Sequence, residues 1–142
     1  MCIRDRLGQG SVFIAPGEGS LSAYLDSLRR LAALDLDVLC PGHGPYVHDP
    51  AAKLAEYLAH RLERERLLLE ALRAGAREEQ ALLDHAWADV APALRPAAGL
   101  TLRAHLGKLN EEGRLPGDLD PGLLETAPVS YTHLTLPTTP YV

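Results

Sequence analysis

The sequence is poor in cysteine, aromatic residues and long apolar runs, and each shortage excludes a class of protein. Two cysteines, Cys2 and Cys40, among 142 residues are too few for a disulfide-stapled scaffold. No apolar run approaches the roughly 20 residues that a membrane-spanning helix needs. The amino-terminal residues MCIRDRLGQG also lack the apolar core of a secretory signal. We therefore expect a soluble, cytoplasmic protein that does not bind membranes.

The charge of the chain is modest, with 14 basic against 19 acidic side chains and a net charge of −5. This balance argues against binding nucleic acid over the whole surface, although it permits a local basic patch. An apolar content of 46% is ordinary for a globular core and excludes disorder of the whole chain. The length suits one domain or two small ones.

Both ends differ in composition from the middle of the chain. Residues 129–142 (VSYTHLTLPTTPYV) contain no charged residue and are rich in threonine and proline, which disfavours helices and central strands. Residues 1–6 (MCIRDR) and this tail also resemble end sequences that recur on unrelated gene predictions. We expect an artefactual leader and an artefactual or disordered tail, with genuine flexible termini as the alternative.

The first half of the chain has the pattern of a strand, a helix and a second strand. Residues 11–15 (SVFIA) predict a strand that stops at a Pro-Gly turn. Ser20 is a suitable N-cap for a helix over residues 20–34, and residues 37–40 (DVLC) predict the second strand. The apolar positions expected to form the buried stripe of the helix are Leu21, Leu25, Leu28 and Ala32. This order suggests an α/β layer.

From residue 50 onward the pattern is helical. Asp49 can cap a long helix over residues 50–74 that has Pro50 in its first turn and ends at Gly75. Its predicted buried stripe consists of Leu54, Leu58, Leu62, Leu69 and Leu72. Further helices are predicted over residues 77–89 and 96–112, and the last of them ends at Gly113. Three helices followed by GRLPGDL have the order of a small helix-turn-helix domain with a short wing. It starts near residue 69 and shares the long helix.

The segment Pro41-Gly42-His43-Gly44 is the best candidate for a chemical site. A histidine between two glycines at the end of a strand can present its imidazole to a pocket at the sheet edge. Taken alone, the segment is weak evidence, because most isolated histidines lie on the surface or in the core. Cys40 and His43 also have C-x-x-H spacing, but zinc would need a second ligand pair, which is absent. We therefore expect Cys40 to be a buried apolar side chain.

Residues 8–65 resemble the carboxyl-terminal half of metallo-β-lactamase-fold hydrolases of the β-lactamase-like protein 2 type. Three pieces carry the resemblance: YLDSL at 24–28, PGHGP at 41–45, and the His60-Arg61…Arg64-Glu65 signature. The helices that follow match the winged-helix-like appendage of that family, so the resemblance covers residues 7–116. It implies an α/β fold, part of the αββα metallo-β-lactamase fold, over residues 7–68. A mostly helical winged-helix-like domain is then expected over residues 69–128.

The resemblance implies a zinc-dependent hydrolase of esters, thioesters or phosphodiesters, in which His43 binds the second of two zinc ions. The HxHxDH motif that supplies other ligands in the family is absent from the sequence. The position that matches the family's bridging aspartate holds Arg4, and Asp5 is one residue out of register. Because a catalytic zinc needs about three protein ligands, we expect no tight zinc binding and no catalysis by this chain. We expect His48 to face solvent.

Two further groups of residues have competing interpretations. The His60, Arg61, Arg64 and Glu65 signature could touch an anionic substrate, but we favour a structural role that braces the long helix against the first domain. The second group could bind nucleic acid, and it consists of Arg95, Arg103, Lys108 and Arg114. We favour a packing module instead, with Trp87 in its core. The substrate of the intact enzyme is expected to be a small molecule or RNA, and a homodimer is compatible with this organisation.

Overall fold

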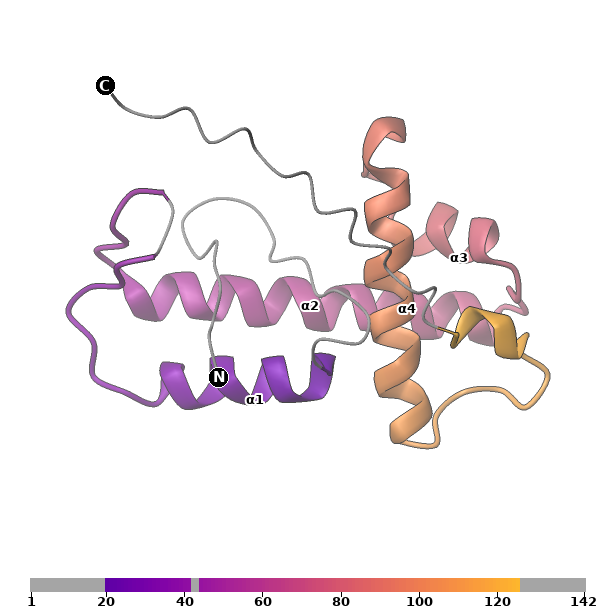
Figure 1. The fold of residues 1–142 in the computed structure, drawn as a ribbon, viewed down its shortest axis with the longest axis horizontal. Helices are drawn as coiled ribbons and strands as arrows, with labels where there is room; N and C mark the ends of the chain where they lie inside the picture. The colour runs from indigo at the N-terminus through magenta and orange to yellow at the C-terminus, as the bar shows by residue number, and fades with distance from the viewer. Residues whose placement is uncertain (1–19, 42–43, 126–142) are drawn as a thin grey trace, which may run out of the picture.

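The computed structural model describes residues 20–41 and 44–125, which form four α-helices and two short 3₁₀ helices. Figure 1 shows α1 (Leu21–Ala32) and α2 (Pro50–Arg73) side by side and antiparallel, with the segment that joins them at one end of the pair. Helix α4 (Arg95–Glu111) crosses α2 near the other end, and α3 (Glu79–Ala86) lies beyond it. The predicted strand at 11–15 and both chain ends lie outside the described residues. No helix among the described residues has the length and apolarity to cross a bilayer.

Helix α1 (Leu21–Ala32) confirms the first predicted helix, although it ends two residues earlier than expected. The Ser20 hydroxyl accepts a hydrogen bond from the Ala23 backbone N–H at 3.1 Å and so caps the helix as predicted. Leu21, Leu25 and Leu28 are buried, whereas Ala32 is exposed. In the last turn it is Leu31, half-buried against Leu28, Leu54 and Tyr57, that faces the core instead.

Helix α2 (Pro50–Arg73) confirms the long predicted helix, with Asp49 accepting from the Ala52 N–H at 3.0 Å and Gly75 following at a φ of 96°. Its predicted stripe is wrong at Leu62, whose side chain is 46% exposed. The buried positions instead recur three or four residues apart as Leu54, Tyr57, Arg61, Arg64 and Leu68. Apolar periodicity therefore predicts the buried Leu54 and Leu72 correctly, but it misses the two arginines of the buried face of α2.

The winged-helix-like part consists of the end of α2, α3 (Glu79–Ala86), η1 (Pro92–Leu94), α4 (Arg95–Glu111) and η2 (Pro121–Leu123). Together these elements bury one continuous apolar cluster that includes Leu68, Leu82, Leu102 and Trp87, as predicted for Trp87. Gly113, with a φ of 66°, ends α4 at the predicted position. In the described residues after Gly113 there is no strand, so the short wing is a turn followed by η2.

The α/β expectation for the first half is met only by its helix. Of the predicted strand at 37–40, only Leu39 pairs, in a single antiparallel bridge with Val47. A two-stranded ladder is marginal without neighbours, and the described residues supply no third strand. The prediction that Cys40 is buried is also wrong, because its thiol is free and exposed. The described part of the chain is therefore mostly helical.

Candidate functional site

The Pro41-Gly42-His43-Gly44 segment lies in the connection between α1 and α2. The Leu39 and Val47 backbones close this connection, each N–H donating to the other's carbonyl oxygen at 3.0 and 2.9 Å. Leu39 packs against the small cluster of Leu28, Leu54 and Tyr57, which anchors the bridge to both helices. Gly44 has a φ of 97°, a conformation that favours glycine. Gly42 and the predicted zinc ligand His43 lie outside the described residues.

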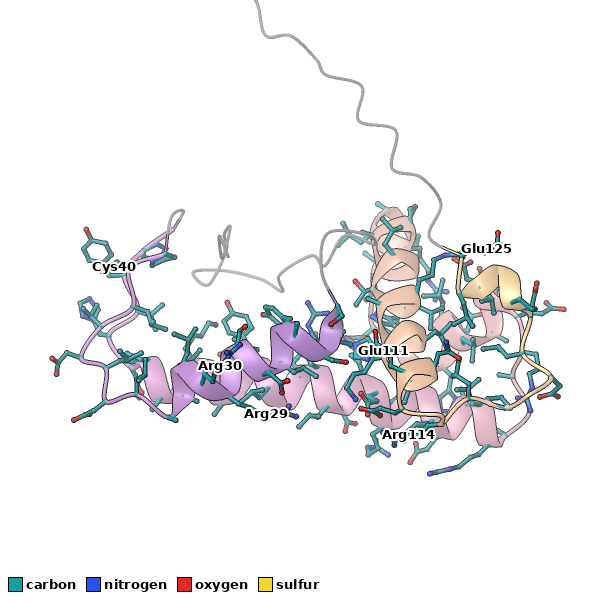
Figure 2. The ribbon with its side chains drawn as sticks, turned by 60° about the horizontal axis from the view of Figure 1, so that its bottom comes forward. Arg29, Arg30, Cys40, Glu111, Arg114 and Glu125 are labelled. Carbon is teal, nitrogen blue, oxygen red and sulfur yellow. The ribbon has the colours of Figure 1, made fainter. Side chains whose placement is uncertain are left out.

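The neighbours of this segment do not complete a metal centre. His48 is exposed, as predicted, and so are Cys40 and Asp49. Among the described residues, no group of three histidine, cysteine, aspartate or glutamate side chains could hold a metal ion. The described donors near the bridge therefore do not by themselves fit a zinc centre, which needs about three protein ligands. Figure 2 shows Cys40 at the end of the molecule opposite Glu125.

The arginine signature on α2 has a structural role. Arg64 donates to both carboxylate oxygens of Asp89 at 2.6 and 2.7 Å and to the Ala86 carbonyl at 2.5 Å. Ala86 is the last residue of α3, so the guanidinium also satisfies a carbonyl at the end of that helix. Hydrogen bonds from Arg64 lower the pKa of the Asp89 carboxyl. The Arg64 guanidinium therefore ties α2 to α3, and both of its terminal nitrogens are already used, so it cannot bind a substrate through two hydrogen bonds.

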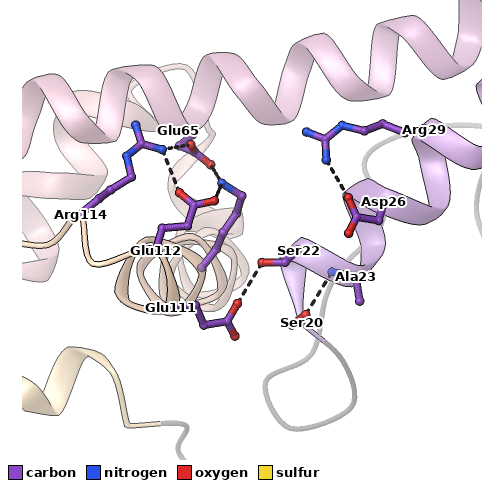
Figure 3. A network of polar contacts seen from close by, with 10 residues as sticks. Ser20, Ser22, Ala23, Asp26, Arg29, Glu65, Glu111, Glu112 and Arg114 are labelled. Carbon is purple, nitrogen blue, oxygen red and sulfur yellow. Dashed lines mark hydrogen bonds and ion pairs between the residues drawn. The ribbon is translucent and has the colours of Figure 1, made fainter.

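Glu65 belongs to a closed ring of ion pairs between α2 and the end of α4. Lys108 Nζ lies 2.8 Å from Glu65 Oε2, as an ion pair without hydrogen-bond geometry, and 2.7 Å from Glu112. Arg114 donates to Glu65 at 3.0 Å and to Glu112 at 2.9 Å. Figure 3 shows Glu65, Glu112 and Arg114 meeting, with the nearby bond from Ser22 of α1 to Glu111. We call Glu65, Lys108, Glu112 and Arg114 the ion-pair ring.

Of the remaining signature residues, Arg61 faces α1, and His60 lines a cavity with His85 and Asp89. Arg61 is only 3% exposed and lies over the Tyr24 ring of α1 at 5.7 Å. Burial lowers the pKa of the Arg61 guanidinium and raises that of the Tyr24 hydroxyl. Burial, and then the neighbouring Arg64, lower the pKa of His60. The predicted contact with the first part of the chain is thus correct for Arg61, whereas Arg64 and Glu65 contact the winged-helix-like part.

Sequence reasoning missed His105, a fully buried histidine on α4. Its side chain is 0% exposed and neither ring nitrogen has a hydrogen-bond partner. The ring contacts Trp87 edge-on, with centroids 5.8 Å apart. Burial, and then the charge of Arg61, lower the pKa of His105 to about 3, so the imidazole is neutral. Its helical spacing from Leu102 and Leu109 was the available signal, because both lie on the core-facing stripe.

The four basic residues proposed for nucleic-acid contact are all ion-paired. Arg95 pairs with Asp84, and Arg103 pairs with Glu79 at 2.5 Å while also donating to the Gly122 carbonyl at 2.9 Å. Lys108 and Arg114 belong to the ion-pair ring. Helix α4 also contacts α1, α2, α3 and η2, so little of its length is open to a groove of nucleic acid.

Comparison with known proteins identifies the class of this fold. Residues 79–116 match the model of the beta-lactamase associated winged helix domain. The beta-lactamase-like protein 2 homolog of Caenorhabditis elegans is 33% identical over 105 residues, covering 68% of this chain and 35% of that protein. The Drosophila melanogaster homolog is 28% identical over 120 residues, covering 77% of this chain and 41% of that protein. Lactamase-like protein nscB of Trichophyton rubrum is 44% identical over 52 residues, covering 37% and 16%.

The helices after Gly75 thus form a winged-helix domain of the beta-lactamase-associated class. The chain as a whole belongs to the beta-lactamase-like protein 2 family. It spans about a third to two fifths of the length of the two homologues of that name.

Proposed function

We propose that this chain carries the winged-helix domain and one zinc ligand, His43, of a zinc-dependent metallo-β-lactamase-fold hydrolase. The Pro41-Gly42-His43-Gly44 segment supports this proposal most directly, together with the relatives named for β-lactamase likeness. In the intact enzyme His43 would be one of the residues that hold zinc, which would supply an activated water for hydrolysis of an ester, thioester or phosphodiester. Three points stay predictions: that the substrate is a small molecule or RNA, that the protein forms a homodimer, and that it is located in the cytoplasm.

We propose further that the chain by itself does not catalyse this hydrolysis. The sequence contains no HxHxDH motif, and Arg4 stands at the position of the bridging aspartate. A single imidazole cannot fix the coordination geometry of a catalytic zinc. The chain should therefore bind zinc no more tightly than a protein with scattered surface histidines.

Hydrolysis assays with the purified chain test this pair of statements. The chain and its His43→Ala variant are incubated with zinc and a chromogenic phosphodiester, a thioester or a cephalosporin. We expect the same background rate from both proteins and from zinc in buffer. Turnover that disappears in His43→Ala would refute the predicted inactivity while supporting the role of His43. Calorimetric titration with zinc checks the second statement, and tight, stoichiometric binding would contradict it.

For the winged-helix domain we propose a packing role, with nucleic-acid binding as the alternative. All four candidate cations are paired with carboxylates, and α4 lies among four other elements. The domain is also acidic, since residues 77–125 contain nine carboxylates against five arginine and lysine side chains. Labelled RNA mixed with the full chain at about 50 mM salt should not shift on a gel. A shift that weakens steeply with salt would favour the nucleic-acid alternative.

A further inference from the structure

A groove with a volume of about 490 Å³ lies between the end of α2 and the segment that follows α4. Its volume falls within the range of pockets that hold small ligands or a few side chains of a partner. It is lined by Leu69, Leu72, Arg73, Arg77, Gly113, Arg114, Leu115 and Pro116, and we call it the arginine groove. Because it lies at the carboxyl end of α2, it is separated from the His43 segment by the length of that helix.

The three arginines of this groove keep hydrogen-bond donors that are not used within the described structure. Arg73 is exposed and makes no hydrogen bond or ion pair to any described residue. Arg77 is held in place by Asp118 at 2.8 Å and by the Leu72 carbonyl at 2.8 Å, through its Nε and Nη1 atoms. Arg114 uses only Nη1, for Glu65 and Glu112. The guanidinium groups of Arg77 and Arg114 are therefore held in position, whereas that of Arg73 is free to move.

The floor of the groove is apolar. Leu72 belongs to the winged-helix core, and Leu69 and Leu115 are partly buried against it. Pro116 and Gly113 complete the floor and present no charge. An apolar floor below arginine donors fits a ligand that has both carboxylates and an aliphatic side chain, because guanidinium groups bind carboxylates in a fork.

Two other cavities in the described structure lack this complementarity. One, of about 540 Å³, is lined by the carboxylates Glu78, Glu79, Asp118 and Asp120 as well as Arg77 and Arg103. Another, of about 560 Å³, contains Arg64, but Asp89 already occupies that guanidinium fork. Of these three cavities, the arginine groove is thus the one in which a cation without a described partner, Arg73, lies beside apolar surface.

We propose that the arginine groove binds a short acidic, leucine-containing peptide segment of a partner protein. Carboxylates of the peptide pair with Arg73 and with the unused nitrogens of Arg114, and an aliphatic side chain lies on Leu69 and Leu115. The site is independent of the hydrolytic function proposed above, because it uses none of the residues near His43.

Fluorescence anisotropy with the full chain tests this proposal. The probe is a fluorescein-labelled octapeptide of glutamate and leucine, and the control probe has lysine in place of glutamate. We expect the acidic peptide to bind saturably and the lysine peptide not to bind. Arg73→Glu should weaken binding at least tenfold, because it replaces a charge-assisted contact with repulsion. Arg73 has no partner to lose, so circular dichroism should show an unchanged fold.

Arg30→Glu is the matched control, because it changes the net charge equally on the exposed side of α1, where Arg30 hydrogen-bonds to Ser27 among the described residues. This variant should bind the acidic peptide as the unaltered chain does. Equal weakening by both variants would overturn the proposal in favour of non-specific electrostatic attraction. Absence of binding at about 1 mM peptide would also overturn it. A third result would overturn it as well. If a short labelled RNA bound more tightly than the peptide, and Arg73→Glu abolished that binding, the groove would be a nucleic-acid site.

Discussion

The winged-helix end of the molecule and the end that carries the His43 segment are held together in different ways. The first buries one continuous apolar cluster, made mostly of leucines and including Trp87. The second has two small clusters between α1 and α2, and it leaves Leu34, Val38 and Tyr46 exposed. Between them lie charged side chains, of which Arg61, Glu65 and Lys108 are buried, whereas Glu112 and Arg114 of the ion-pair ring are exposed. Apolar packing therefore stabilises one end, whereas at the middle of α2 ion pairing fixes how the helices meet.

The largest expected effect separates the two ends by truncating one leucine in each. Leu102→Ala removes a fully buried side chain from the winged-helix core and should lower the free energy of unfolding by about 4 kcal/mol. Leu34→Ala removes a side chain that is 57% exposed and should cost less than about 0.5 kcal/mol. Urea unfolding midpoints of the two variants measure the difference. Equal losses would show that the loop end is as tightly packed as the core.

The next effect tests the ion-pair ring that joins α2 to α4. Glu65→Ala leaves buried Lys108 without its partner on α2 and should cost about 3 kcal/mol. Glu63→Ala is the matched control on the same helix, since among the described residues Glu63 pairs with exposed Arg66 alone, so its loss should have a much smaller effect. Thermal unfolding monitored by circular dichroism compares the two variants. If both cost the same, the ring contributes nothing beyond an exposed ion pair.

Helix positions were predictable from the sequence, but the buried face of α2 was not. Local signals such as Ser20, Asp49, Gly75 and Gly113 act on the backbone nearby, and the structure confirms each of them. The buried positions at Arg61 and Arg64 depend on partners more than 20 residues away, Tyr24 and Asp89. Since apolar periodicity counts leucines, it gave Leu62 a core position that the structure assigns to arginines.

The candidate site was predictable only as a segment. The Pro41-Gly42-His43-Gly44 pattern and its family resemblance point to the connection between α1 and α2, and the exposure of His48 is confirmed. The strand expected before it depended on neighbouring strands that the described residues do not supply, which explains both the single bridge at Leu39 and the exposed Cys40. The role of His43 as a zinc ligand stays a prediction.

The third expected effect is a dependence of stability on pH that comes from the buried His105 side chain. His105 has a folded pKa of about 3, below its unfolded value near 6.5, so its neutral form favours the folded state above pH 6.5. As pH falls from 6.5 to 4.5, stability should decrease by about 2.5 kcal/mol, because the unfolded chain gains a proton that the folded chain excludes.

The cations that face His105 are Arg61 and Arg64 of α2 and Lys108 of α4, with His60 as a further titratable neighbour, and each opposes its protonation. His105→Leu should remove most of the pH dependence in this interval. His60→Gln is the control and should remove less, since His60 is exposed. Urea titrations at pH 6.5, 5.5 and 4.5 measure the slopes. An unchanged slope in His105→Leu would show that the imidazole is not excluded from protonation.

The smallest expected effect sharpens the contrast at the loop end. Because the Cys40 thiol is exposed, Cys40→Ser should change the free energy of unfolding by less than about 0.5 kcal/mol. In a Cys2→Ser background, the same thiol should react with a chromogenic disulfide reagent in the folded protein as fast as in urea. A thiol that reacts only after unfolding would place Cys40 in a packed environment. Such a result would support the buried strand that the sequence pattern predicts. The two ends of the molecule would then no longer differ in how tightly they pack.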